Sequence, residues 1–84
     1  MSLTLNKRKT LRENLLKELY DYHLKSGGEA LYIYLDVYVS EEDKEKHVAY
    51  EYLNDKGLIE YKSFSKDKYM AKITSYGIDT VENS

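Results

Sequence analysis

The chain contains no cysteine, and this absence removes several classes of chemistry. Disulfide bonds, thiolate nucleophiles and cysteine-ligated zinc sites are excluded, so the stability of the fold must come from packing. No apolar run approaches the roughly 18 residues that a membrane-spanning helix needs, and the first residues do not have the pattern of a signal peptide. These absences favour a cytoplasmic protein with no membrane partner.

Residue types that carry catalysis are equally scarce. The chain has two histidines, His23 and His47, which fall on different predicted helices, and it has neither a glycine-rich phosphate loop nor an HExxH motif. Asp43 and His47 are four residues apart and can share one face of a helix, but two ligands make only a weak metal site. We therefore expect no enzymatic activity, no bound metal and no cofactor.

The 84 residues present predict one small domain with a thin core. A chain of this length buries about 60–65% of its unfolded surface, and 42% hydrophobic with 33% charged residues is ordinary for a soluble globular protein. The ten tyrosines suit such a domain, because a tyrosine ring packs half-buried while its hydroxyl reaches water. We favour this packing role over base stacking or an aromatic partner surface.

The first predicted helix is marked by a capping box and an apolar stripe. Thr10 followed by Glu13 predicts a start at Thr10. A start one turn earlier, near Asn6, is the alternative and would place Lys7–Lys9 on the first turn. Gly27 ends the helix, because glycine takes the left-handed conformation after a helix without penalty. The apolar stripe consists of Leu11, Leu15, Leu16, Leu19 and Tyr22.

Residues 30–40 carry two overlapping patterns. Aliphatic residues alternate with tyrosines from Leu31 onward, which is typical of a strand. The spacing of Leu31, Leu35 and Tyr38 also fits one face of a short helix. We expect an extended start at Leu31–Ile33 and then a short helix at Asp36–Tyr38.

A second long helix is predicted from Ser40 to Lys56. Ser40 and Asp43 form another capping box, and the acidic residues that follow Ser40 suit the positive end of the helix dipole. Gly57 ends this helix. Its predicted apolar face consists of Val48, Ala49, Tyr52 and Leu53.

The last third of the chain predicts a hairpin and a closing helix. Leu58–Phe64 and Lys68–Ile73 are rich in β-formers and flank a polar tip. Thr74 caps the final helix, in which Gly77 predicts close packing against a neighbouring element. Across all segments, the positions expected to be most buried are Leu15, Leu19, Val48, Tyr52, Leu53, Leu58, Ile73 and Ile78.

The order of these elements, the motif YLNDKGLIEY at residues 52–61 and the pair Thr74 and Gly77 resemble the winged helix-turn-helix family. The resemblance covers residues 10–82. It implies an α+β fold, namely a small winged-helix domain of three to four helices with a β-hairpin wing, over residues 10–84. Residues 1–9 would then form a basic N-terminal arm, whose first three residues we give no functional weight.

Members of this family mostly bind duplex DNA, with the helix before the wing in the major groove and the wing along the backbone. The resemblance makes Ser40–Lys56 the recognition helix. Its candidate base contacts are Lys44, Lys46, His47, Tyr50 and Asn54. Candidate phosphate contacts on the wing and the arm are Lys62, Lys66, Lys68, Lys7, Arg8, Lys9 and Arg12.

Two functions follow from the resemblance. The first is a DNA-binding transcriptional regulator that acts as a homodimer through its surplus apolar residues. The second is a winged-helix protein-interaction or dimerisation module without nucleic-acid binding, whose acidic helix start docks on a basic protein partner. The net charge of −2 and the repulsion between phosphates and Glu41 and Glu42 weigh against DNA. DNA binding requires Lys62, Lys66 and Lys68 on the same side as that helix start.

Overall fold

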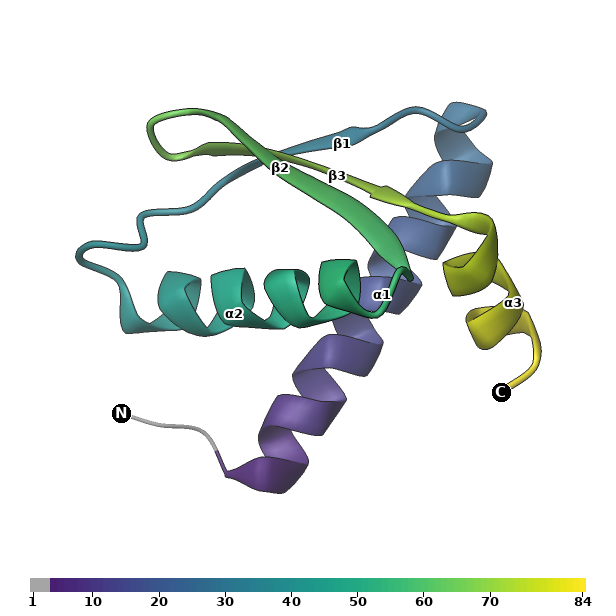
Figure 1. The fold of residues 1–84 in the computed structure, drawn as a ribbon, viewed down its shortest axis with the longest axis horizontal. Helices are drawn as coiled ribbons and strands as arrows, with labels where there is room; N and C mark the ends of the chain where they lie inside the picture. The colour runs from purple at the N-terminus through teal and green to yellow at the C-terminus, as the bar shows by residue number, and fades with distance from the viewer. Residues whose placement is uncertain (1–3) are drawn as a thin grey trace.

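The computed structural model describes residues 4–84 and contains three helices and one three-stranded antiparallel sheet (Figure 1). The expected α+β class is therefore confirmed, and residues 1–3 of the expected arm lie outside the described residues. The elements in chain order are α1 (Leu5–Ser26), β1 (Leu31–Tyr34), α2 (Glu41–Asp55), β2 (Ile59–Ser65), β3 (Lys68–Ile73) and α3 (Ser75–Glu82).

Helix α1 begins at Leu5, so the predicted start at Thr10 is wrong and the earlier alternative is confirmed. The Thr4 side chain caps the helix by accepting the Lys7 N–H at 3.2 Å. Thr10 lies inside the helix, and residues 5–9 form its first turns rather than a separate arm. Both threonines suit a cap, and the earlier start adds helical hydrogen bonds and brings Arg8 to α2.

Residues 31–40 form strand β1 and a turn, so the short helix expected at Asp36–Tyr38 is wrong. The Asp36 carboxylate accepts the N–H groups of Tyr38 and Val39, each at 3.3 Å. The Asp36 carbonyl accepts the Ser40 N–H at 3.0 Å. These local bonds satisfy the backbone without a helix, which is the usual way that aspartate competes with helical structure.

The sheet has the strand order β1-β3-β2, with β3 in the centre. The predicted hairpin of β2 and β3 is confirmed, and Ile59 lies opposite Ile73 in the register. The pairing shifts between Ser63 and Ser65, which leaves Phe64 as an extra residue in a β-bulge. Asp67, at the tip, adopts a φ of 65° that aspartate tolerates better than most residues.

The core lies between one face of the sheet and the helices, which gather on that side (Figure 1). Side chains of β3 alternate, so that Tyr69, Ala71 and Ile73 point into the core while their neighbours face outward. The opposite face of the sheet is not covered by any helix of residues 4–84. The buried hydrophobic residues are Leu15, Leu16, Leu19, Leu35, Ala49, Tyr50, Leu53, Ile59, Tyr69, Ala71 and Ile73.

Half of the predicted core is confirmed by burial, namely Leu15, Leu19, Leu53 and Ile73. Leu58 and Ile78 are half-buried at the edge of the core.

The prediction is wrong for Val48 and Tyr52, which are 59% and 41% exposed. Tyr50 takes their place, because its ring stacks on Tyr61 of β2 with centroids 5.0 Å apart. This contact rotates α2 away from the predicted apolar face. Tyr52 instead lies beneath the guanidinium group of Arg12, which is 4.1 Å from the ring centroid.

Helix α3 is fixed against the base of the hairpin, as Gly77 predicted. The Thr74 side chain accepts the Gly77 N–H at 3.2 Å and donates to the Gly57 carbonyl at 2.6 Å. A Cβ atom at Gly77 would collide with the carbonyl oxygen of Leu58 and with Cγ1 of Ile73. Only glycine therefore allows α3 to approach this closely.

We predict that Leu53→Ala lowers the free energy of unfolding by about 2–5 kcal/mol, because it opens a cavity in a well-packed core. Val48→Ala, on the exposed side of the same helix, should change it by less than about 0.5 kcal/mol. Urea unfolding followed by circular dichroism measures both values. Equal losses for the two variants would contradict the rotation of α2 described above.

Candidate nucleic-acid interface

The start of α2 is anchored to the preceding turn. Ser40 Oγ accepts the Asp43 N–H at 3.1 Å, which confirms the predicted cap. The Asp43 carboxylate accepts the Asp36 N–H at 2.9 Å rather than reaching back to Ser40. Asp43 therefore holds the turn in place, and this role competes with pairing with His47 as a metal ligand.

The two lysines predicted to contact bases are matched by carboxylates of the same helix. Lys44 Nζ lies 3.3 Å from Glu41 Oε1. Lys46 Nζ lies 3.9 Å from Glu42 Oε1. Exposed pairs of this kind contribute about 0–1 kcal/mol and can open. Opening of these ion pairs does not change the negative charge of the segment, because Glu41–Lys46 carries four carboxylates against two lysines.

His47 and Asn54, also predicted to contact bases, face strand β2 instead. His47 Nδ1 shares a hydrogen bond of 2.8 Å with the Tyr61 hydroxyl, and His47 Nε2 lies 3.5 Å from Glu51 Oε1. Asn54 Oδ1 accepts the Tyr61 N–H at 3.1 Å. Both side chains therefore bind the helix to the sheet, and a base contact would have to break these bonds.

The prediction of Tyr50 as a base contact is wrong, because this side chain is only 5% exposed. Its ring begins a stack that continues through Tyr61 to Tyr69, with centroids 5.3 Å apart in the second step. Burial raises the pKa of Tyr50 to about 12, and burial also raises the pKa of Tyr61 and of Tyr69. The candidate base contacts on α2 are thus paired, hydrogen-bonded or buried.

The basic residues of the predicted arm lie on α1, and two of them are engaged within the domain. Arg8 contacts both carboxylate oxygens of Glu45, each at 3.3 Å. Arg12 covers the ring of Tyr52. The first turns of α1, which carry Lys7 and Lys9, lie at the end of the helix farthest from the sheet (Figure 1). The cations of α1 and those of the β2–β3 hairpin therefore do not form one surface.

The hairpin carries a cluster of four lysines. Lys62 lies on β2, Lys66 at the tip, and Lys68 and Lys72 on β3. Within residues 4–84, no ion pair involves these lysines. Because side chains alternate along a strand, Lys62, Lys68 and Lys72 point to the outer face of the sheet, which is the face away from the helices. The nearest acidic neighbour on that face is Glu60, which lies opposite Lys72 in the register.

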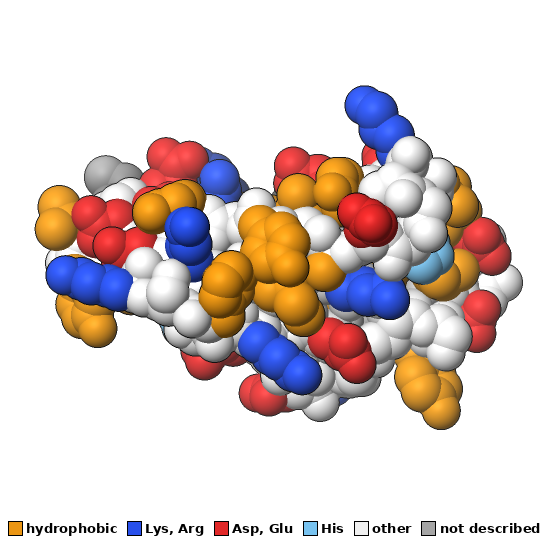
Figure 2. All heavy atoms as spheres, turned by 90° about the horizontal axis from the view of Figure 1, so that it is seen from above, with side chains coloured by type: hydrophobic (Ala, Val, Ile, Leu, Met, Phe, Trp, Pro, Cys, Tyr) orange, Lys and Arg blue, Asp and Glu red, His pale blue; other side chains and the backbone are white. Residues whose placement is uncertain are grey.

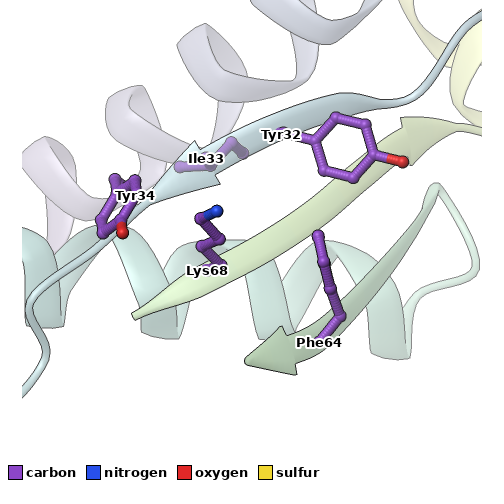
Figure 3. A pocket seen from close by; sticks show the side chains of 5 residues that line it. All are labelled: Tyr32, Ile33, Tyr34, Phe64 and Lys68. Atoms are coloured by element: carbon purple, nitrogen blue, oxygen red, sulfur yellow. The ribbon is translucent and has the colours of Figure 1, made fainter. Parts of the chain in front are cut away.

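The outer face of the sheet also displays aromatic rings, which no local sequence pattern indicated as a site. Tyr32, Tyr34 and Phe64 are 66%, 71% and 56% exposed. Together with Ile33 and Lys68 they line an open groove of about 280 Å³ (Figure 3). Figure 2 shows hydrophobic side chains at the centre of this face, with lysines and arginines around them and acidic side chains among these. We define the outer face as Tyr32, Tyr34, Glu60, Lys62, Phe64, Lys68, Met70 and Lys72.

The alternation of residues 31–34 was the signal that could have revealed this surface. It placed Tyr32 and Tyr34 on one side of a strand. The register of β1 against β3 was needed to bring them beside Phe64 and Lys68, because Tyr32 pairs with Met70 and Tyr34 with Lys68. This pairing joins residues distant in sequence and cannot be read from a local pattern.

Comparisons of the chain with protein-family models, with curated proteins and with solved structures find no match. The described helices include none that is long and apolar enough to cross a membrane. No cluster of three or more histidine, aspartate or glutamate side chains within residues 4–84 is placed to hold a metal ion.

We predict a steep loss of stability in alkali. Because burial holds the pKa of Tyr50 above the ordinary value of 10.0, the unfolded chain loses its proton first as the pH rises. The stability that protonated Tyr50 contributes to the folded state is complete below pH 10 and is lost as the pH rises toward 12. Thermal melts across this pH range should show a smaller fall in melting temperature for Tyr50→Phe than for the parent. Tyr76→Phe, which removes an exposed hydroxyl, should fall like the parent, and a Tyr50→Phe curve equal to it would contradict the prediction.

Proposed function

We propose that this chain is a winged-helix domain that binds nucleic acid through the outer side of its β-hairpin rather than through α2. The order of elements supports the winged-helix assignment, because a capped helix leads through Gly57 directly into the hairpin, and α3 closes it. In this assignment β1 pairs with β3 at the edge of the sheet, and the turn shaped by Asp36 occupies the place of a further short helix.

The observation that carries the proposal is the cluster of unpaired lysines on the hairpin, in a protein whose net charge is −2. Lysines on an exposed hairpin favour contacts with phosphates, which supply affinity without reading sequence. The engaged side chains and the acidic start of α2 oppose base reading in a major groove. Regulation of transcription and a homodimeric state remain predictions from the family resemblance.

A second candidate function, a protein-interaction module, is favoured by the surface around the start of α2. The side chains of Glu41 and Glu42 are 62% and 82% exposed. Tyr38 and Val39, in the turn just before them, are 76% and 78% exposed. Acidic and apolar side chains together suit a basic amphipathic segment of a partner, because charge complementarity sets partner choice.

We predict that Lys66→Glu with Lys68→Glu weakens binding of labelled nucleic acid to a similar extent for all sequences, because phosphates and not bases are contacted. The slope of log K against the logarithm of the salt concentration should also become shallower. Two phosphate contacts are lost, and each contributes about 0.9 to the slope for duplex DNA. Fluorescence anisotropy at 50 and 200 mM salt measures both effects.

Lys17→Glu with Lys25→Glu, on exposed positions of α1, makes the same change in net charge and is the matched control. An equal loss of binding in this control would show that net charge and not the hairpin matters. No binding by the parent at micromolar concentration to any duplex or single strand would end the nucleic-acid proposal.

For the second candidate, we predict that Glu41→Lys with Glu42→Lys abolishes recovery of a protein partner by affinity capture. Glu13→Lys with Glu18→Lys, also exposed but on α1, should leave recovery unchanged. Thermal melts of both variants control for the loss of favourable helix-dipole interactions, about 0.3–1 kcal/mol per residue. A partner recovered equally by both variants would not use the start of α2.

A further inference from the structure

We infer that the outer face of the sheet is a platform for single-stranded nucleic acid, on which exposed aromatic rings stack bases and the hairpin lysines hold phosphates. This inference rests on the proposed function and names the ligand class. Single-strand binding surfaces combine aromatic side chains that accept base faces with cations that follow the backbone. The outer face brings these two components together on neighbouring strands.

The rings are presented to solvent from both edges of the sheet. Tyr32 on β1 and Phe64 on β2 meet edge to face, with centroids 5.3 Å apart and an interplanar angle of 74° (Figure 3). Strand β3 runs between β1 and β2 in the sheet, and Tyr32 lies opposite its Met70. The edge-to-face contact holds the two rings in place and leaves more than half of each side chain accessible.

The position of Phe64 depends on the β-bulge. Ser63 pairs with Tyr69 and Ser65 pairs with Lys68, so Phe64 has no partner of its own in the ladder. Bulges bend a strand and redirect a side chain, and they are frequent beside functional sites. An exposed phenylalanine at 56% has no packing role in the core, and its placement beside Tyr32 is consistent with a binding surface.

The cations lie between and beside the rings. Lys68 lines the same groove as the aromatic side chains, and its Nζ is 5.7 Å from the centroid of Tyr34. Lys62 and Lys72 extend the positive charge along β2 and β3. Three lysines against the single Glu60 give the outer face a charge opposite to that of the whole protein and complementary to a phosphate backbone.

The aromatic rings select a single strand over a duplex. In a duplex each base is covered on both faces by its neighbours, so only phosphates and groove edges can be contacted. Tyr32 and Tyr34 are two residues apart on one strand, or about 7 Å, roughly twice the 3.4 Å rise between stacked bases. Each ring can therefore receive its own base from a strand that has been opened.

The charge of the face argues against a second copy of this chain as its occupant. A two-fold symmetric interface places the same patch of both subunits in contact. The three lysines of one outer face would then meet those of the other, with one glutamate on each side to compensate. Like charges brought together across an interface disfavour association.

The test compares fluorescein-labelled 15-nucleotide oligothymidylate, oligouridylate and a 15-base-pair duplex by fluorescence anisotropy in 50 mM salt. We expect the single strands to bind more tightly than the duplex, and the two single-stranded arms distinguish DNA from RNA. Tyr32→Ala with Phe64→Ala should weaken single-strand binding roughly 10- to 100-fold, while duplex binding stays within about twofold. Tyr32→Phe should retain binding, and Tyr76→Ala, an equally exposed tyrosine on α3, is the matched control.

The outcomes separate this inference from the proposed function. Equal binding of duplex and single strand that depends on Lys66 and Lys68 but not on the rings would overturn the inference and keep the proposed function. No binding of any probe would overturn both. A dimer in sedimentation that the double aromatic variant dissociates, without oligonucleotide binding, would assign the outer face to self-association and would likewise overturn the inference.

A second measurement does not depend on how the variants fold. In heteronuclear NMR of the unmodified protein, oligothymidylate should shift the ring resonances of Tyr32 and Phe64 and the methyl resonance of Met70. The amides of α1 should remain unchanged. Shifts confined to the α2 face, with none on the outer face, would contradict the inference even if binding is observed.

Discussion

The stack of Tyr50, Tyr61 and Tyr69 fixes the rotation of α2 against the sheet, and the character of the molecular surface depends on that rotation. Because Tyr50 is drawn into the core, His47 and Asn54 are brought against β2, where they form hydrogen bonds to Tyr61. The same rotation turns Val48 out to solvent. A helix that would otherwise offer polar side chains to a groove instead uses them to hold the sheet.

The charge of the protein is also divided into two regions. Carboxylates dominate the start of α2, while unpaired lysines dominate the outer face of the hairpin. A protein with small net charge can still steer a charged ligand when its charges are separated in this way. A polyanion approaching at low ionic strength is turned from the helix toward the sheet, and screening by salt weakens this guidance.

The sequence predicts the elements that depend on local chemistry. The caps at Ser40 and Thr74, the stop at Gly57 and the hairpin tip were predictable, because each depends on a few adjacent residues. The start of α1 was not decided locally, because Thr4 and Thr10 are both suitable caps. The tertiary contact of Arg8 with Glu45 adds to the earlier start.

The rotation of α2 and the outer face could not be predicted for a different reason. Tyrosine suits the core and the surface almost equally, so the choice between Tyr50 and Tyr52 is made by the rings of β2 and β3. Three of the candidate base contacts, His47, Tyr50 and Asn54, therefore face the sheet and not solvent, although the helix itself was correctly predicted. The pairing of β1 with β3, which assembles the outer face, joins residues about forty positions apart.

The close packing of α3 against the base of the hairpin determines how relatives of this chain can be recognised. Apolar core positions can exchange among residues of similar volume, so they diverge readily. Gly77 cannot gain a Cβ atom, Gly57 has a φ of 76°, and Thr74 bridges the two by its side chain. A distant relative that has lost all other resemblance should keep glycine at the first two positions and a hydroxyl at the third. This three-residue signature, and not overall identity, is the trace by which common ancestry would be detected.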